Sequence, residues 1–310
     1  MSGAVRVVVV TYSPGESLAA FLDSLGDATS RHVRVVLADN GSTDGAPEAA
    51  AERPGVELLP TGGNLGYGGG ANVGAGLLAG TGASAAASSG DEPWLVVANP
   101  DITWHKGALD TLLDAAERWP RGGAFGPAIL TPRGDLYPSA RAFPTLGRGV
   151  GHALLGWWWP ANPWTRSYRQ ESGGPVEGRA GWLSGSCMLL RRSAFDEVGG
   201  FDPGYFMYFE DLDLCRRLAD AGWESVYVPT AVVEHTGAHS TSRNRNAMLR
   251  AHHRSAYRYL AGQYAGPRWL LVRVALRAGL AARYRLSLLV RGLGEGARPT
   301  RSGEVLGRGD

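Results

Sequence analysis

The chain has 310 residues, of which 44% are hydrophobic and 19% charged, and its formal net charge is +2. These values are ordinary for a soluble globular protein and allow one large α/β domain with additions, or two small domains. They exclude a disulfide framework, because Cys187 and Cys215 are the only cysteines, and a transmembrane helix, because no segment offers about 20 apolar residues free of charge.

The first segment, Val5–Thr11, is a β-branched run interrupted only by Arg6, and no basic leader precedes it. It predicts a strand buried on both faces rather than a signal peptide. Further strands are expected at 33–38, 56–59 and 94–98, and apolar spacing predicts helices over 18–25 and 109–116. This alternation is typical of a Rossmann-like, mostly parallel sheet with helices on both faces.

Polar residues follow three of these strands, as Thr11-Tyr12, Asp39–Asp44 and Asn99–Asp101. Ligands of parallel α/β sheets bind beyond the carboxyl ends of the strands. We therefore expect the three clusters to meet in one ligand site.

A glycine-rich stretch, residues 62–76, follows the third strand and leads into a small-residue helix. Its Gly66–Ala71 portion matches G-x-G-x-x-G/A, but a dinucleotide fingerprint follows the first strand and has an acidic residue about 20 positions on. We therefore expect a loop whose backbone approaches a ligand, with Asn64 and Asn72 as polar contacts.

The second half of the chain is less regular. Pro, Gly, Arg and Trp dominate between residues 125 and 182, which predicts long loops. Strands are then expected at 182–190 and 224–228, a helix at 212–221, and basic helices after about residue 244.

Two aspartates are candidate site residues. Asp101, at a strand end, suits Mg²⁺ or Mn²⁺, since these ions bind few protein carboxylates and complete their shell with water and diphosphate oxygens. Asp39, with Ser42 and Asp44 near it, suits a hydrogen bond to a nucleoside. Both segments also fit simple turns, because Asn, Pro, Asp and Gly all favour them.

Glu210, Asp211 and Asp213 open the helix at 212–221, where acids stabilise the helix dipole whatever else they do. An apolar cluster, residues 204–209, precedes them. Burial against it raises the pKa of a carboxyl group, which suits a general base.

His235 follows the last strand, with His239 four residues on. A neutral imidazole is a common metal ligand, although a lone histidine is more often structural. Ser186 lies in L-S-G-S-C, which lacks the G-x-S-x-G nucleophile elbow, so a serine hydrolase is not expected.

Seven segments occur in one order: Val7–Tyr12, D-N-G-S-T-D at 39–44, N-L-G-Y at 64–67, N-P-D at 99–101, Gly185-Ser186 with Arg191-Arg192, G-G-F-D at 199–202 and F-E-D-L-D at 209–213. Together they resemble the family 2 glycosyltransferases of GT-A fold, and within them the bacterial rhamnosyltransferases. The resemblance covers roughly residues 5–240. It implies a GT-A catalytic domain over 1–240, a C-terminal helical extension over 241–295 and a flexible tail over 296–310.

The resemblance also implies a nucleotide-sugar site, whose residues come from the first four segments. They are Thr11, Tyr12, Asp39 and Ser42 for the nucleoside, and Asn64, Gly66, Asn72 and Asn99 for the rest of the donor pocket.

Asp101 matches the last acid of the family's D-x-D metal motif, whose first acid is replaced here by Asn99. His235 matches a later histidine that completes the metal site in related enzymes, so Mg²⁺ or Mn²⁺ is expected on these two residues. Asp211 matches the catalytic base, with Glu210 beside it. Trp182, Gly185 and Ser186 would face the acceptor or the donor sugar.

The implied mechanism is inverting. The metal neutralises charge on the leaving diphosphate, and Asp211 takes the proton from an acceptor hydroxyl that attacks the opposite face of the anomeric carbon. Residues 139–145 look like a segment of rhamnosyltransferases that use a dTDP-linked donor. We therefore expect dTDP-L-rhamnose as the donor, with a galactofuranosyl or N-acetylhexosaminyl donor as the alternative. The expected acceptor is a glycan or a polyprenyl-diphosphate-linked sugar of cell-envelope polysaccharide synthesis.

A catalytically inactive, nucleotide-sugar-binding scaffold of the same fold is the alternative to an enzyme. The missing acid at Asn99 favours the scaffold. Asp101, Asp211 and His235 favour the enzyme more strongly, because a scaffold needs none of the three.

Residues 243–310 hold 14 arginines against three acids, a net charge of +11, so the first 242 residues carry −9. Residues 267–290 mix apolar side chains with arginines, which predicts a basic amphipathic helix on an anionic membrane surface. The protein would then be cytoplasmic and peripheral on the inner face of the plasma membrane. Packing of this helix on the catalytic domain is the alternative. No nucleic-acid partner is expected, because aromatic residues are not spread through the basic stretch, and the sequence makes no prediction of oligomeric state.

Overall fold

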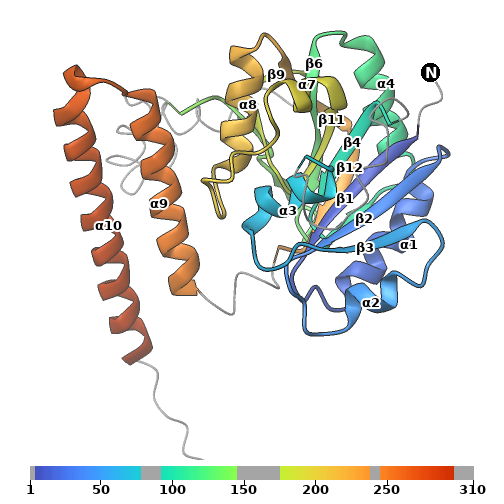
Figure 1. Cartoon of the computed structure of the whole chain (residues 1–310), viewed down its shortest axis with the longest axis horizontal. Coiled ribbons are helices and arrows are strands. Elements are labelled where there is room, and N and C mark those ends of the chain that lie inside the picture. The colour runs from blue at the N-terminus through green and yellow to red at the C-terminus, as the bar shows by residue number, and fades with distance from the viewer. Residues whose placement is uncertain (1–3, 78–91, 145–174, 238–244, 297–310) are drawn as a thin grey trace, which may run out of the picture. The chain divides into compact units, whose positions relative to one another are not determined.

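The structure is a computed structural model that describes residues 4–77, 92–144, 175–237 and 245–296 (Figure 1). Contacts divide the chain into two units, Met1–Arg243 and Asn244–Asp310. The domain limits expected at residues 240 and 296 stay predictions, and the segment 297–310 lies outside the described residues.

The first unit is built on a mixed, mostly parallel sheet of ten strands in the order β3-β2-β1-β4-β11-β6-β12-β5, with β7 on β6 and β9 on β12. Strands β8 and β10 form a separate pair. The strands are β1 (Val5–Thr11), β2 (Val33–Asp39), β3 (Val56–Pro60), β4 (Trp94–Ala98), β5 (Ile102–Trp104), β6 (Gly122–Leu130), β7 (Leu136–Tyr137), β8 (Ala140–Arg141), β9 (Gly178–Ala180), β10 (Trp182–Leu183), β11 (Cys187–Arg191) and β12 (Glu224–His235).

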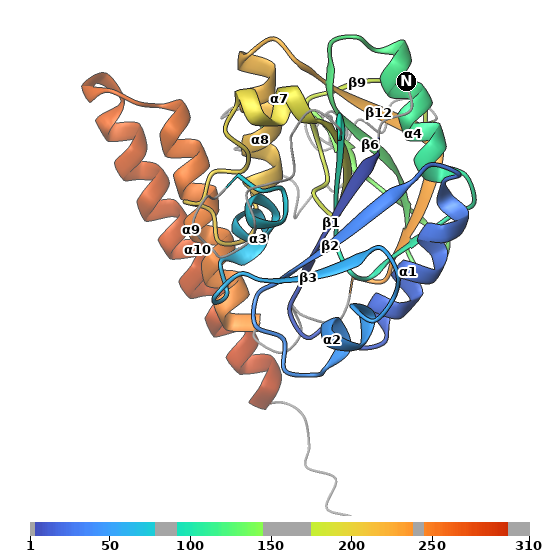
Figure 2. The same cartoon turned by 45° about the vertical axis from the view of Figure 1, so that its right-hand side comes forward.

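Helices cover both faces of this sheet (Figures 1 and 2). One face carries α1 (Ser17–Ala28), α2 (Ala46–Ala50) and α4 (Ala108–Arg118); the other carries α3 (Gly66–Gly74), α7 (Arg192–Glu197) and α8 (Glu210–Asp220). Strand β1 pairs in parallel with β2 and β4, and every residue of β1 is buried. The predicted parallel α/β sheet is therefore confirmed, and it gathers the carboxyl ends of β1, β2, β3 and β4 at one edge.

The glycine-rich segment is a helix, α3, and not the loop expected from the sequence. A Cβ at Gly74 would lie 2.4 Å from Val8 Cγ1, and one at Gly70 would lie 2.8 Å from Val10 Cγ1. These glycines therefore allow the helix to pack closely on β1. The same glycine pattern is also typical of a loop near a ligand, so the sequence alone did not distinguish the two.

Two further expectations for the second half were wrong. The region expected to be loops from residue 125 contains the strand β6. Its Pro127 lies beside the irregularity between Val228 and Val232 of β12, where a proline is tolerated. The single strand expected at 182–190 is two strands, β10 and β11, which lie in different sheets and are separated by residues 184–186.

The second unit contains α9 (Arg245–Gln263), the short 3₁₀ helix η1 (Pro267–Trp269) and α10 (Leu270–Gly296), so the predicted C-terminal helices are present. Helices α9 and α10 meet through the rings of His253 and Tyr284, whose centroids are 5.6 Å apart. Within the described part of the chain, no helix combines the length and the apolar character that a membrane span requires.

Candidate functional site

The predicted polar clusters lie at the carboxyl edge of the sheet. Thr11 and Asp39 are partners in the parallel register of β1 and β2, and the Thr11 hydroxyl donates a 2.8 Å hydrogen bond to Asp39 Oδ1. Asp39 also accepts hydrogen bonds from the backbone N–H groups of Gly41 and Ser42 and from the Ser42 hydroxyl.

The Asp39 carboxylate thus holds the Asp39–Asp44 turn in place, with Gly41 at a φ of +95°. Ser42 Oγ in turn accepts from the backbone N–H of Ser13 at 2.8 Å, which joins this turn to the end of β1. Tyr12 is half exposed beside it, with 51% of its surface accessible. The arrangement leaves an aromatic face next to an ordered polar turn, and the nucleoside contacts of these residues stay a prediction.

Asn40, which sequence reasoning did not single out, connects this turn to the start of α3. Its Nδ2 donates to Gly66 O at 3.0 Å, and its Oδ1 accepts from the Thr61 hydroxyl at 3.0 Å. Asn64 is exposed and its Oδ1 accepts from the Gly66 N–H. A side chain at Gly66 would collide with Phe206 O at 1.9 Å, so only glycine permits this approach.

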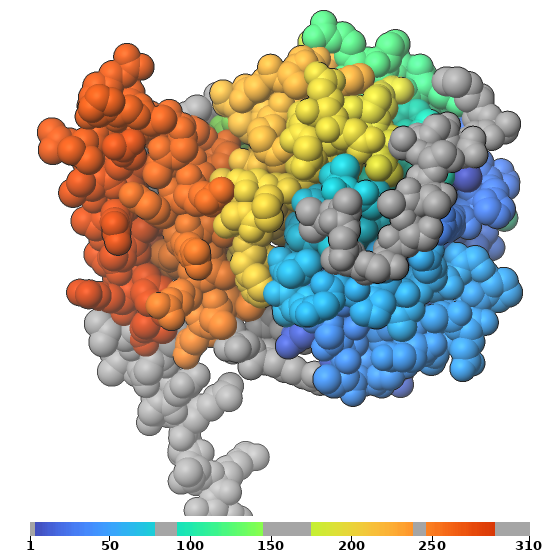
Figure 3. Space-filling model, viewed as in Figure 1, coloured from blue at the N-terminus to red at the C-terminus, as the bar shows by residue number. Residues whose placement is uncertain are grey.

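Asn72 is buried, and both ends of its amide bind the backbone of Phe201. Nδ2 donates to Phe201 O at 2.7 Å, and Oδ1 accepts from Phe201 N at 2.9 Å. The residue fixes the segment before α8 against α3, and Figure 3 shows these two segments in contact. Its described contacts are thus structural, and its predicted place in the donor pocket stays a prediction.

A second cluster joins the end of β4 to the end of β12. Asp101 Oδ1 lies 3.1 Å from His235 Nε2, and Asn99 Nδ2 lies 3.2 Å from the same nitrogen. The backbone N–H of Gly237 donates to Asp101 Oδ2. Burial by itself raises the pKa of Asp101, but the hydrogen bond and charge of His235 and the Gly237 N–H outweigh it and lower the pKa below its ordinary value. His239 lies outside the described residues.

The Asp101–His235 pair fits a divalent cation. A carboxylate and an imidazole are both common ligands of such ions, and here the two side chains lie 3.1 Å apart as a hydrogen-bonded pair. Among the described residues no group of three or more His, Cys, Asp or Glu side chains converges in this way. The pair would hold a metal together with oxygens of a bound diphosphate and water.

The third cluster surrounds Asp211, the second residue of α8. Its Oδ2 accepts the Gly185 N–H at 2.9 Å, and its Oδ1 accepts the Leu212 N–H at 2.8 Å. The Tyr67 hydroxyl donates to the carbonyl of the same Gly185. A Cβ at Gly185 would lie 3.1 Å from the Asp211 Cβ, so the glycine lets the turn before β11 reach the carboxylate.

Burial raises the pKa of Asp211, although the Gly185 and Leu212 N–H groups and the Arg141 charge act against this. Burial, followed by the charge of Asp211, raises the pKa of Glu210 to about 8. Glu210 is only 6% exposed, and within the described part of the chain its Oε2 has no hydrogen-bond partner. Asp211 is partly buried and keeps acceptor capacity beyond its two hydrogen bonds, which suits a general base.

The last predicted residues lie around the same turn. The Ser186 carbonyl accepts the Asn99 N–H at 2.8 Å, so the turn also contacts the metal-candidate cluster. The Ser186 hydroxyl is 3.0 Å from that of Ser184. Trp182 is 9% exposed, and its face is covered by the Arg141 guanidinium at 5.1 Å. Sequence reasoning noted the segment containing Arg141 but gave that residue no role, because its contact with Trp182 depends on strand pairing that the sequence does not reveal.

Two family models match this chain: "Glycosyl transferase family 2" over residues 6–199 and "Glycosyltransferase like family 2" over residues 152–257. The N-acetylglucosaminyl-diphospho-decaprenol L-rhamnosyltransferase of Mycobacterium tuberculosis H37Rv is 55% identical over 287 residues, which cover 92% of this chain and 93% of the relative. The rhamnosyltransferase WbbL of Escherichia coli K12 is 28% identical over 260 residues, 83% of this chain and 92% of the relative.

Two solved structures share the fold. GalNAc-T7 with UDP, GalNAc and Mn²⁺ has a TM-score of 0.53 and 14% identity, covering 76% of this chain and 44% of the other. Residues 1–349 of Staphylococcus aureus TarS give a TM-score of 0.50 and 13% identity, covering 80% of this chain and 65% of the other. At these identities the likeness shows the fold alone.

Proposed function

Because this chain belongs to glycosyl transferase family 2, and is a glycosyltransferase of the rhamnosyltransferase type, we propose that it transfers L-rhamnose from dTDP-L-rhamnose to a polyprenyl-diphosphate-linked N-acetylglucosamine. The proposed product is an intermediate of cell-envelope polysaccharide synthesis. The acceptor follows the activity for which the 55% identical mycobacterial relative is named, and that relative matches along 93% of its own length.

The observation that carries the chemistry is the Gly185–Ser186 turn, which contacts both reacting clusters. Gly185 N binds the Asp211 carboxylate, and Ser186 O binds the backbone of Asn99, two residues before Asp101. One short turn therefore ties the proposed base to the candidate metal pair. An acceptor hydroxyl at Asp211 and a donor diphosphate at Asp101 would lie on either side of it.

In the proposed reaction Asp211 accepts the proton of the acceptor hydroxyl. The hydroxyl oxygen attacks the anomeric carbon of the donor from the face opposite the leaving diphosphate, whose bond to that carbon breaks, so the configuration inverts. The raised pKa of Asp211 makes it a stronger base than an exposed aspartate. When bound, Mg²⁺ or Mn²⁺ would supply charge neutralisation for the leaving diphosphate, and Asp101 and His235 would hold it. The ordered turn at Asp39 and the exposed Tyr12 ring are proposed to hold the nucleoside.

The test measures release of nucleoside diphosphate by the full chain with Mg²⁺ or Mn²⁺ and a polyprenyl-diphosphate-linked N-acetylglucosamine. The donors are dTDP-rhamnose, UDP-galactofuranose and UDP-N-acetylglucosamine. We expect turnover of dTDP-rhamnose that EDTA abolishes and that Asp211→Asn lowers about 10²- to 10⁴-fold, the usual share of a general base.

Asp213→Asn is the matched control, because Asp213 lies in the same helical turn but pairs with Arg217 at 2.7 Å. It should keep the wild-type rate. Turnover of another donor would discard rhamnose and keep the mechanism. Donor binding without turnover, unchanged by Asp211→Asn, would establish a scaffold instead.

A second observation favours a membrane-surface role for α10. This helix exposes Leu270, Leu271, Val274 and Leu286, with Leu271 at 81%, and Arg273, Arg277, Arg283 and Arg285 lie among them. Exposed leucines beside arginines complement an anionic lipid surface, where the acceptor's lipid chain resides. We propose that α10 lies on the cytoplasmic face of such a membrane.

Sedimentation of the full chain with vesicles tests this. Binding to phosphatidylglycerol vesicles should exceed binding to phosphatidylcholine vesicles and should fall in Leu271→Asp. Val176→Asp is the control, because Val176 is 76% exposed outside the helix. Equal loss in both variants, or no loss in Leu271→Asp, would contradict the proposal.

A further inference from the structure

We propose that Arg141, held between Tyr137 and Trp182, binds the diphosphate of the lipid-linked acceptor beside the proposed base. This inference rests on the proposed function, because it supplies the second of two diphosphate contacts that the reaction needs. Asp101 and His235 would hold the ion that receives the donor diphosphate, and Arg141 would receive the diphosphate of the acceptor.

Arg141 is held firmly by its surroundings. It is the cross-strand partner of Trp182 in the β8–β10 pair. Its guanidinium carbon lies 5.1 Å from the Trp182 ring centroid and 5.4 Å from that of Tyr137. Arg141 Nε donates to Pro138 O at 2.8 Å, and Nη2 donates to the Tyr137 hydroxyl at 3.1 Å.

Gly181, the residue before β10, permits this arrangement. A Cβ there would lie 2.5 Å from the backbone N of Phe143 and 2.9 Å from Arg141 O. The strand that carries Arg141 is therefore packed closely against the one that carries Trp182. A charged side chain fixed in this way loses little conformational freedom when it binds an anion.

Arg141 lies on a different strand pair from the predicted nucleoside residues and close to the helix that carries the proposed base. The predicted nucleoside residues stand at the ends of β1 and β2, whereas β8 and β10 form a separate pair, and α8, which begins with the proposed base, packs on β10. Arg141 is close enough to Asp211 for its positive charge to lower the pKa of that carboxyl group, although burial dominates and keeps it raised. An acceptor sugar whose hydroxyl meets Asp211 has its diphosphate one pyranose ring away.

The carboxylates around the proposed base favour such a cation. Asp101 and Asp211 are acidic groups of this site, and both act on Tyr67 through their charges. A second diphosphate would be repelled unless a fixed cation received it, and a guanidinium matches phosphate oxygens with paired N–H donors. In addition, Trp182 Nε1 is a buried donor without a hydrogen-bond partner among the described residues, and an acceptor oxygen would satisfy it.

The test compares two acceptors, N-acetylglucosamine linked through a diphosphate to farnesol and the uncharged decyl N-acetylglucosaminide. Arg141→Gln should raise KM for the diphosphate acceptor about 10- to 100-fold, the loss expected for charge-assisted hydrogen bonds. KM for dTDP-rhamnose and KM for the neutral glycoside should not change. Any effect of the lost charge on Asp211 enters kcat with both acceptors alike, so the ratio of their kcat/KM values isolates the diphosphate contact.

Arg141→Lys keeps the positive charge but loses the paired N–H donors of the guanidinium, and should give an intermediate KM for the diphosphate acceptor. It also serves as the informative variant if Arg141→Gln fails to fold. Arg179→Gln is the control, because Arg179 lies on β9 and pairs with Glu224 instead. Equal losses with both acceptors, or a rise confined to the donor KM, would overturn the inference.

Equilibrium binding of the farnesyl-diphosphate acceptor without any donor separates this inference from the proposed function. If the wild-type chain binds it and Arg141→Gln does not, the acceptor contact stands even where dTDP-rhamnose is not turned over. If both chains bind it equally, the inference fails even where rhamnose transfer is observed.

Discussion

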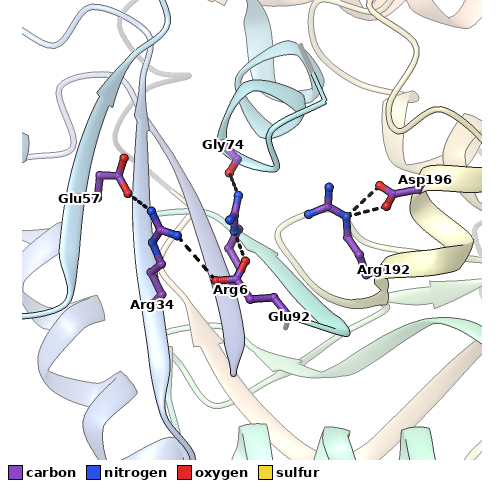
Figure 4. A network of polar contacts seen from close by, with 7 residues as sticks. All are labelled: Arg6, Arg34, Glu57, Gly74, Glu92, Arg192 and Asp196. Atoms are coloured by element: carbon purple, nitrogen blue, oxygen red, sulfur yellow. Dashed lines mark hydrogen bonds and ion pairs between the residues drawn. The ribbon is translucent and has the colours of Figure 1, made fainter. Parts of the chain in front are cut away.

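Charged side chains have different partners at the two edges of the same sheet. At the amino edge, where β1, β2 and β3 begin, the charged side chains are arranged as cation–carboxylate pairs (Figure 4). At the carboxyl edge, buried carboxylates are bound by backbone N–H groups or by a histidine, and Glu210 Oε2 has no partner among the described residues. The first arrangement stabilises the fold, and the second leaves charge available to a substrate.

The amino edge centres on Arg6 and Glu92, which are both nearly fully buried and whose Nε and Oε2 are 2.6 Å apart. Arg6 is in register with Arg34, so two cations stand side by side on parallel strands. Glu92 also lies 3.9 Å from Arg34, which binds Glu57 at 2.6 Å. Arg192 and Asp196 add a further pair at this edge.

Positive charge compensates the carboxylates less at the carboxyl edge, where the charge of Arg141 lowers the pKa of Asp211 but burial outweighs it. Glu210 and Asp211 are adjacent acids, and burial raises the pKa of each. Among the described residues their hydrogen-bond partners are backbone groups, and Glu210 Oε2 has none. Unsatisfied buried groups of this kind cost stability and gather at functional sites.

The largest stability effect is expected at the amino edge, from Glu92→Gln. Removing one partner of a buried ion pair leaves Arg6 charged and uncompensated, which costs about 3–5 kcal/mol. Chemical denaturation should show this loss in the free energy of unfolding, while KM for donor and acceptor stays at its wild-type value in the folded enzyme. A raised KM without a stability loss would show that the two edges are not separate in function.

Glu210→Gln tests the carboxyl edge through pH. The unfolded carboxyl group titrates near its ordinary value of 4.5 and the folded one near 8, so between these values the folded state holds the extra proton. Wild-type stability from this group is therefore full below about pH 4.5 and is lost as the pH rises through 8, by up to about 1.4 kcal/mol per pH unit. The variant should lack this slope and exceed the wild type at pH 8.5.

Thermal unfolding between pH 5 and pH 9 measures that difference. Glu52→Gln, at an exposed position, should retain the wild-type slope. Parallel stability curves for wild type and Glu210→Gln would show that Glu210 is ionised in the folded enzyme across this range.

The sequence predicted the carboxyl edge better than the amino edge, for a physical reason. Site residues follow strands directly, so Asp39 and Asp101 could be placed from strand ends alone. The Arg6–Glu92 pair joins residues 86 positions apart, and the Gly185–Asp211 contact joins residues 26 apart. Such contacts depend on strand order, which periodicity does not encode. For the same reason α3 was expected to be a loop, since only its packing on β1 explains its glycines.

The smallest effect is expected from Glu57→Gln, in the same charge network as Glu92. The Arg34 and Glu57 side chains are 41% and 45% exposed, so water and salt already screen their attraction. The loss should stay below about 1 kcal/mol and shrink further in 0.5 M salt, where the Debye length is only a few ångströms. The Glu92→Gln loss should persist in the same salt, because that pair is buried. Equal salt dependence of the two losses would mean that solvent reaches Arg6, and the contrast between the two edges would then rest on pairing alone and not on burial.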